Sequence, residues 1–220
     1  MLRLENISKS YPQRGVVLDN LNFEANQGNS IAITGPSGSG KTTLMNIIGA
    51  LDRPDSGDVI FKGGSVLAFN SDELAKYRNS NIGFVFQDHL LLNHLTIREN
   101  ILLPVFAEKI KEEDYAEKEE YCTSLMEHIG IKELSDKFPF QISGGEAQRA
   151  TLVRALIGKP SMLLADEPTG SLDSKNADIL GRLLIEMNKE YGITLIVATH
   201  SGDLASRMGL HLKLEDGTLK

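Results

Sequence analysis

The chain contains 220 residues, of which 41% are hydrophobic and 24% charged, so it is long enough to bury a sizeable core without covalent staples. Its single cysteine, Cys122, cannot form an internal disulfide, which favours a reducing compartment. A formal net charge of -7 argues against a nucleic-acid partner, because neutralising phosphates requires a concentrated basic face.

The first ninety residues are predicted to mix strands with one helix. The N-terminal strand, Leu2 to Ile7, alternates apolar and polar residues and lacks the long apolar stretch of a secretion signal, so we expect the chain to stay in the cytoplasm. The other predicted elements are strands at Leu21 to Ala25, Ser30 to Thr34, Val59 to Phe61 and Ile82 to Phe86, and a helix from Lys41 to Leu51. No window reaches the roughly 18 to 20 apolar residues of a membrane span, so a membrane role would require a partner.

Between about residues 90 and 158 the pattern becomes helical, as in a helical insertion. Two capping boxes mark helix starts there, one at Thr96/Glu99 and one at Ser143/Glu146. The highly charged stretch from 109 to 120 is typical of a solvated helix face rather than of a docking patch.

After Pro160 the predicted strands return. Two short apolar strands, Met162 to Ala165 and Thr194 to Ala198, flank a helix from about Ser174 to Glu190. A strand, a helix and a strand in this order predict a buried parallel sheet of the α/β class.

A complete phosphate-binding loop lies between a predicted strand and a predicted helix. Its glycines let successive backbone N–H groups face a phosphate, while Lys41 reaches the β and γ oxygens and the Thr42 hydroxyl coordinates magnesium. An ordinary glycine-rich turn is the alternative, but a chance match occurs in only on the order of one per cent of chains this long. The residues assigned to the nucleotide here are Gly35, Pro36, Ser37, Gly38, Ser39, Gly40, Lys41, Thr42 and Thr43.

An acidic pair, Asp166 and Glu167, follows the predicted strand at Met162 to Ala165. Asp166 would enter the magnesium shell, and Glu167, ionised at neutral pH, would polarise the attacking water. Such a pair alone is commonly a plain strand end. Beside a phosphate-binding loop, the catalytic interpretation is the stronger one.

His200 follows the predicted strand at Thr194 to Ala198 and should emerge at the same edge of the sheet. A single histidine is more often structural than catalytic. This position, however, brings an imidazole within reach of the γ-phosphate, as a sensor or as a group that orients water. The other four histidines have no comparable context, and we assign them no chemistry.

The segment Ser143–Glu146 predicts a second anion site, because Ser143 caps a helix whose first turn contains two glycines. One nucleotide does not need two such sites on one chain. If this segment cannot reach the chain's own phosphate-binding loop, it must serve a nucleotide held by another subunit. A capping box on a helix that tolerates glycine is an equally weighted alternative.

With these motifs in place, the sequence resembles the ATP-binding subunits of ABC transporters over essentially its whole length. The matching positions, in the family's order, are Tyr11 for the aromatic that stacks on adenine, residues 35–42 for the Walker A loop, Gln87 for the Q-loop, Ser143, Gly144, Gly145 and Glu146 for the signature, Asp166 and Glu167 for the Walker B pair, Ser171, Leu172 and Asp173 for the D-loop, and His200 for the switch histidine. Because a single aromatic after a strand is more often a packing residue, Tyr11 rests on the family register alone.

The resemblance implies a P-loop NTPase core with a mostly parallel sheet, an N-terminal antiparallel β subdomain and an inserted helical subdomain. It assigns the core and β subdomain to residues 1–89 and 159–220, and the helical subdomain with the signature to residues 90–158. The implied cofactors are ATP and Mg²⁺. The implied catalytic residues are Glu167, His200 and Lys41, the implied magnesium ligands are Thr42, Gln87 and Asp166, and Tyr11, Gln87, Asp173 and the signature complete the nucleotide site.

The resemblance further implies a head-to-tail homodimer that clamps two ATP molecules, each between one chain's Walker A loop and the other chain's signature. This agrees with the two anion sites expected above. Three residues depart from the usual family pattern, namely Ile142, Glu146 and Ser201, which stand where leucine, glutamine and aspartate are common. None of them removes a ligand or the catalytic glutamate, so we expect both composite sites to be active.

Within the family, the segments Ile82–Gln87 and Ala165–Gly170 are similar to the branch that drives lipoprotein release from the inner membrane. That branch also contains macrolide and peptide exporters and a cell-division ATPase. We therefore expect a peripheral ATPase at the cytoplasmic face of the inner membrane, which drives separate transmembrane subunits docked near Gln87 to Glu99. One alternative is a cell-division subunit that regulates periplasmic wall hydrolases. A soluble ABC ATPase acting on nucleic acid or ribosomes is the other, and a single acidic ATPase half argues against it.

Overall fold

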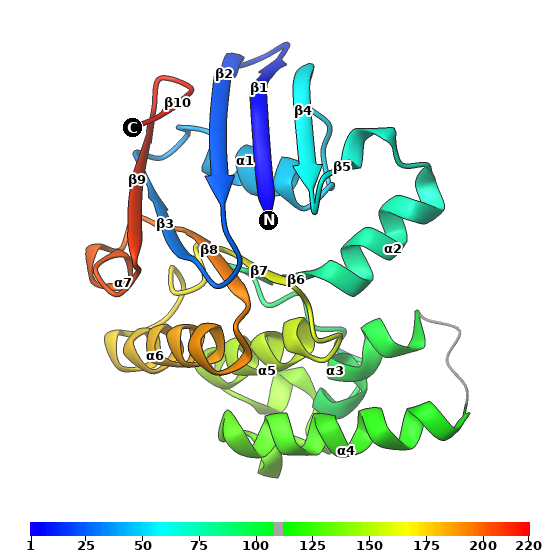
Figure 1. Cartoon of the computed structure of the whole chain (residues 1–220). Coiled ribbons are helices and arrows are strands. Elements are labelled where there is room, and N and C mark those ends of the chain that lie inside the picture. The colour runs from blue at the N-terminus through cyan, green and yellow to red at the C-terminus, as the bar shows by residue number, and fades with distance from the viewer. Residues whose placement is uncertain (108–111) are drawn as a thin grey trace.

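Two sheets form the framework of the computed structural model, which describes residues 1–107 and 112–220 (Figure 1). The first is antiparallel, with strand order β2-β1-β4-β5, and the second is largely parallel, with strand order β10-β9-β3-β8-β7-β6. The strands are β1 (Leu2–Tyr11), β2 (Gly15–Ala25), β3 (Ser30–Thr34), β4 (Ser56–Phe61), β5 (Gly64–Ser65), β6 (Ile82–Phe86), β7 (Met162–Asp166), β8 (Thr194–Ala198), β9 (Leu210–Glu215) and β10 (Thr218–Leu219). The predicted α/β class with an N-terminal antiparallel sheet is confirmed.

The first strand is longer than predicted, because β1 continues past Ile7 to Tyr11. Between Leu4 and Ser10 the pairing of β1 with β2 shifts register three times, and the simple alternation of buried and exposed residues is lost there. The sequence pattern therefore ends where the bulges begin. This extension forms the hairpin that carries Tyr11 toward the helix at Lys41.

The central strands β3, β7 and β8 are buried along most of their length, as expected for parallel strands covered on both faces. They pair in parallel with each other and with β6, so their carboxyl ends meet at one edge of the sheet. Helix α1 (Lys41–Ile48) packs between the two sheets, where Leu44 and Ile48 join a core with residues of β1, β2 and β4.

The remaining helices are α2 (Ser71–Asn81), α3 (Ile97–Phe106), α4 (Glu112–His128), α5 (Gly144–Leu156), α6 (Ser174–Tyr191) and α7 (Gly202–Ala205), with short 3-10 turns at Val66–Ala68, Lys132–Leu134 and Pro139–Gln141. Both predicted capping boxes are present, at Thr96/Glu99 and Ser143/Glu146. Helix α1 ends at Ile48 instead of Leu51, and a side chain at Gly49 would collide with the ring of Phe84.

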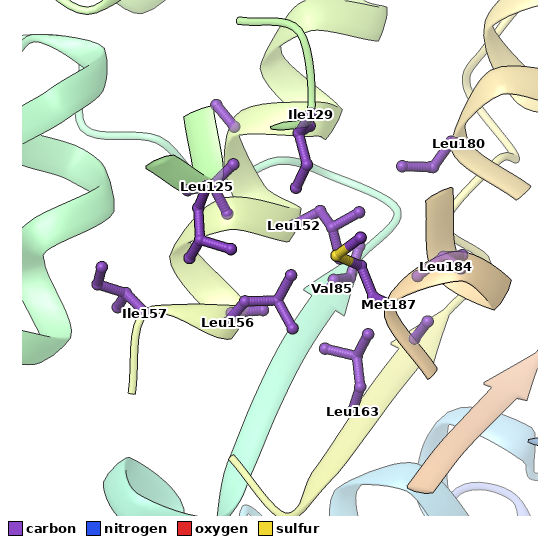
Figure 2. Packing of buried hydrophobic residues seen from close by; sticks show 14 of the residues in the cluster. Val85, Leu125, Ile129, Leu152, Leu156, Ile157, Leu163, Leu180, Leu184 and Met187 are labelled. Atoms are coloured by element: carbon purple, nitrogen blue, oxygen red, sulfur yellow. The ribbon is translucent and has the colours of Figure 1, made fainter. Parts of the chain in front are cut away.

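Helices α3 to α6 lie on the side of the parallel sheet opposite the antiparallel sheet (Figure 1). Their apolar faces share one core with the sheet. Figure 2 shows Leu125 from α4 and Leu156 from α5 packing beside Val85, Leu163 and Met187. Because α5 packs directly against strand β6 in this core, the start of α5 has a defined position relative to the sheet.

The charged stretch from 109 to 120 falls partly outside the described residues, which resume at 112. Side chains described from Tyr115 to Glu120 are exposed or half-buried. Within residues 1–107 and 112–220, none of the helices combines the length and apolar character needed to cross a membrane.

Candidate functional site

The phosphate-binding loop joins β3 to α1, where the sequence predicted it. Gly35 has a φ of 152°, and a Cβ there would lie 2.3 Å from the Leu214 carbonyl oxygen, so this position requires glycine. The Lys41 side chain is buried and folds back over the loop. Its Nζ donates to the carbonyl oxygens of Gly35 at 2.9 Å and Pro36 at 3.2 Å. The lysine is thereby held at the mouth of the loop.

Asp166 ends β7 beside the loop, and its carboxylate is under-satisfied. Its Oδ1 atom is buried and has no hydrogen-bond partner. Burial raises the pKa of Asp166 above its ordinary value, against the opposing effect of a hydrogen bond with Thr42. A buried carboxylate oxygen without a donor beside a threonine hydroxyl offers the hard oxygen ligands that Mg²⁺ prefers. The residues present therefore fit this ion.

Glu167 is held in place by both its backbone and its side chain. Its backbone has a φ of 48°, a left-handed conformation that is rare for glutamate, and its N–H donates to the Ala198 carbonyl at 2.8 Å. The carboxylate accepts the His200 backbone N–H at 3.2 Å and lies 2.8 Å from His200 Nδ1. Oε1 is also 3.8 Å from Lys41 Nζ. The three predicted catalytic side chains therefore meet at one carboxylate.

A cavity of about 440 Å³ lies over the phosphate-binding loop. Its lining residues are Arg14, Val17, Ser37, Gly38, Gly40, Lys41, Thr42, Thr43, Gln87, Glu167 and His200. The structure thus brings together the predicted loop, Gln87, Glu167 and His200 from four separate segments. Among the described residues that line this cavity, none belongs to the signature segment Ser143–Glu146 or is Asp173.

Tyr11 lines a neighbouring cavity of about 450 Å³, together with Thr42 and Thr43 at the start of α1. Its hydroxyl donates to Asp52 Oδ2 at 2.7 Å, and Lys9 Nζ lies 5.2 Å from the centre of its ring. Burial, followed by the hydrogen bond with Asp52, raises the pKa of Tyr11. Tyr11 was expected here from the sequence, but Asp52 and Lys9 were not, because only the packing of β1 against the segment after α1 brings them together.

The signature segment begins α5, and its side chains bond to each other. Glu146 accepts from both the backbone N–H and the hydroxyl of Ser143, which lowers the pKa of Glu146. A Cβ at Gly145 would lie 2.4 Å from the side chain of Asn176, whereas one at Gly144 would meet nothing within 4 Å. Asn176 in turn donates to Asp173, the N-cap of α6. The signature and Asp173 are therefore neighbours in one chain.

Two polar residues of α5 that the sequence analysis missed fix the segment around Gln87. The Gln148 side chain is 1% exposed and donates to the Phe86 carbonyl at 2.6 Å. Arg154 donates to the carbonyls of His89 and Leu90 at 2.9 and 2.8 Å. A glutamine on the apolar face of a predicted helix was the available signal, since buried polar side chains require partners.

Comparison with known proteins places this site in a family. The model of the ABC transporter family matches residues 18–170. The lipoprotein-releasing system ATP-binding protein LolD 1 of Rhodopirellula baltica is 44% identical, covering 100% of this chain and 96% of its own. LolD of Myxococcus xanthus is 41% identical, covering 99% of this chain and 97% of its own.

Solved structures agree with this placement. The dimeric ATP-binding cassette MJ0796 in a post-hydrolysis state, bound to ADP and Pi, has a TM-score of 0.87 and 36% identity and covers 100% of this chain and 97% of its own. The cassette cbiO1 of Clostridium perfringens, part of the ABC transporter complex cbiONQ, has a TM-score of 0.88 and 28% identity, covering 100% of this chain and 86% of its own. The chain therefore belongs to the ABC transporter family and is one of its ATP-hydrolysing cassettes.

Proposed function

We propose that two copies of this chain close head-to-tail on ATP and drive separate transmembrane subunits that release lipoproteins from the inner membrane. The main support for this proposal is that the parts of the nucleotide site lie in two separate places on one chain. The phosphate cavity is lined by Lys41, Glu167 and His200, while the signature at Ser143–Glu146 lies outside that lining. A signature contributed by a second copy would complete the site, and the dimeric cassettes of similar fold support this arrangement.

In hydrolysis, Glu167 orients the attacking water and polarises it toward the γ-phosphate. Its carboxylate is suited to this role because His200 and the positive-φ backbone hold it in one position. Lys41 leaves its loop carbonyls to bind the β and γ oxygens and stabilise the charge that develops there. His200, the most exposed of the three, is placed to contact both the γ-phosphate and Glu167.

Thr42, Asp166 and Gln87 would hold magnesium at this site. When bound, the ion offsets the negative charge of the phosphates. The unpartnered Oδ1 of Asp166 supports its place in this set, whether the contact is direct or through water. Gln87 is exposed at the end of β6, where its backbone carbonyl accepts from the Ser171 hydroxyl at 3.4 Å. This contact links the magnesium ligands to the segment that leads to Asp173.

The membrane subunits would dock beside the segment from Gln87 to Glu99, at the cytoplasmic face. A groove of about 450 Å³ lies next to this segment, lined by Leu51, Arg78, Phe84, Phe86, Pro104 and Arg154 among others. Leu90, Leu92 and Phe106 are exposed apolar residues on the neighbouring loop and helix. Gln148 bonds to the last residue of β6 and Arg154 to the segment after it, so a movement of the membrane subunits at this groove would be transmitted to α5 and its signature. Residues 90–158 would then move as the helical subdomain.

Two relatives that match along nearly their full length are named as lipoprotein-releasing subunits, and this supports lipoproteins as the cargo. A phosphate-release assay on the full chain, alone and with its membrane subunits, tests the ATPase mechanism. Glu167→Gln should bind ATP but lower turnover by about a hundredfold or more, and should accumulate the ATP-bound dimer. Glu24→Gln, an exposed acid on β2, is the matched control. Turnover in Glu167→Gln equal to that of the control would refute the role of Glu167.

A further inference from the structure

Arg14 stands at the tip of the hairpin between β1 and β2, within reach of the nucleotide site. Its backbone N–H donates to the Tyr11 carbonyl at 3.0 Å, which closes the turn, and Tyr11 pairs with Gly15 across the hairpin. Gly15 has a φ of 70°, a conformation that favours glycine. The backbone of Arg14 is therefore fixed by its neighbours, and only its long side chain is free to reorient.

Arg14 lines three cavities that surround the phosphate-binding loop. One contains Lys41 and Glu167, the second contains Tyr11, and the third runs along Pro36 to Ser39. Only Thr42 and Thr43 share with Arg14 the lining of both the first and the second cavity. Arg14 thus sits where the end of the site that holds the γ-phosphate meets the end that holds the base.

The guanidinium of Arg14 has no hydrogen bond or ion pair to any residue in the described part of the chain. No ion pair joins it to Glu215 or Asp216, the acids of the third cavity, and Glu215 is already paired with Lys213 and Lys220. By contrast, Arg154 on α5, away from this site, donates to two backbone carbonyls. An exposed guanidinium without a partner keeps its full capacity to bind an anion.

The carboxylates near the phosphate-binding loop mean that a second cation would help to bind a triphosphate. Lys41 is the cation of the phosphate-binding loop, and Glu167 lies 3.8 Å from its ammonium and offsets part of its charge. Asp166 adds a further carboxylate beside the loop. A triphosphate brings several negative charges into this cavity, and a guanidinium binds phosphate oxygens through two parallel N–H groups.

We propose that Arg14 binds the α- and β-phosphates of the nucleotide, between Tyr11 at the base and Lys41 at the γ-phosphate. This rests on the nucleotide site proposed above and adds a ligand-binding residue to it. Arg14 acts on affinity and not on chemistry, because the reacting γ-phosphate faces Glu167 and His200 at the other end of the cavity. The contact is common to ATP and ADP, since both carry these two phosphates.

The test is calorimetric titration of the full chain with ATP, ADP and inorganic tripolyphosphate. Arg14→Ala should weaken the binding of each of these three ligands by about tenfold. This loss in affinity is at the lower end of the range for hydrogen bonds to a charged group. The affinities of Arg14→Lys should lie between those of the wild type and Arg14→Ala, because lysine keeps the charge but lacks the two parallel N–H groups of the guanidinium. Lys76→Ala, which removes an exposed cation from α2, is the control and should bind like the wild type. In turnover, Arg14→Ala should raise KM and leave kcat within twofold.

Binding of ATP and tripolyphosphate by Arg14→Ala within twofold of the wild type would overturn the inference. Weaker ATP binding with unchanged tripolyphosphate binding would also overturn it, by assigning Arg14 to the ribose or base. Lys41→Ala separates this inference from the proposed function. If Lys41→Ala no longer binds ATP while Arg14→Ala binds it normally, only the role proposed for Arg14 is refuted. If neither variant affects ATP binding, the nucleotide site itself is wrongly placed.

Discussion

Asn100 offers a quantitative prediction, because a single buried amide holds the loop that follows Gln87. The side chain is fully buried in α3 and donates to the carbonyls of Leu92, Leu95 and Thr96 at 2.9 to 3.1 Å. It also accepts the Leu92 backbone N–H at 2.7 Å. Asn100→Ala removes all four bonds. The Thr96 and Leu92 carbonyls keep their bonds from the backbone N–H groups of Asn100 and Leu95, so two groups of the loop, the Leu95 carbonyl and the Leu92 N–H, are left without a partner.

At about 1 kcal/mol for each group left without a partner, Asn100→Ala should lower the free energy of unfolding by about 2 kcal/mol. For a chain of this size, that corresponds to a fall in Tm of about 4–8 °C. Urea unfolding followed by far-ultraviolet circular dichroism measures the change. Asn93→Ala, at an exposed position of the same loop, is the control and should stay within about 0.5 kcal/mol of the wild type. A loss in Asn100→Ala no larger than in the control would refute this reasoning.

Two further substitutions test packing and charge. Gly145→Ala should lower the free energy of unfolding by about 1–3 kcal/mol, because the new methyl group would collide with Asn176. Gly144→Ala, where the methyl group meets open space, is the control and should be neutral. Equal melting temperatures for the two variants would contradict this. Asp178 pairs with Arg182 and Arg207, which lower its pKa to about 2. Because the pKa of Asp178 is lower in the folded state than in the unfolded state, the wild type should have a higher free energy of unfolding than Asp178→Asn. This difference should be complete above about pH 4–5 and vanish toward pH 2. A pH-independent difference in urea midpoint between these two proteins would exclude the linkage.

Most strands of the parallel sheet could be predicted because their burial in the fold is visible in the local sequence pattern. Strands β3, β6, β7 and β8 appear in the sequence as short apolar runs, since parallel strands in a covered sheet are buried on both faces. Capping boxes at Thr96 and Ser143 are likewise local features and lie where they were expected. The phosphate-binding loop, Glu167 and His200 could be placed together because each follows the end of a parallel strand.

What escaped prediction depends on contacts between distant segments. Helix α2 is mostly polar and shows no apolar face, although Asn70 and Glu73 form a capping box at its start. The partners Tyr11 and Asp52 are 41 positions apart, and Gln148 reaches Phe86 over 62 positions. No periodicity in the sequence records such pairs. They are fixed by the packing of the hairpin on α1 and of α5 on the sheet, which only the assembled fold shows.

The proposed dimer builds each ATP site from the phosphate-binding loop of one chain and the signature of another. It is tested most directly by mixing two inactive variants, Lys41→Ala and Ser143→Arg, and measuring phosphate release. Each variant alone should be inactive, because both of its composite sites are defective. An equal mixture should regain about a quarter of wild-type activity, since half of the dimers are mixed and each mixed dimer holds one intact site. If the mixture stays inactive although both variants are folded, the two-chain site is contradicted.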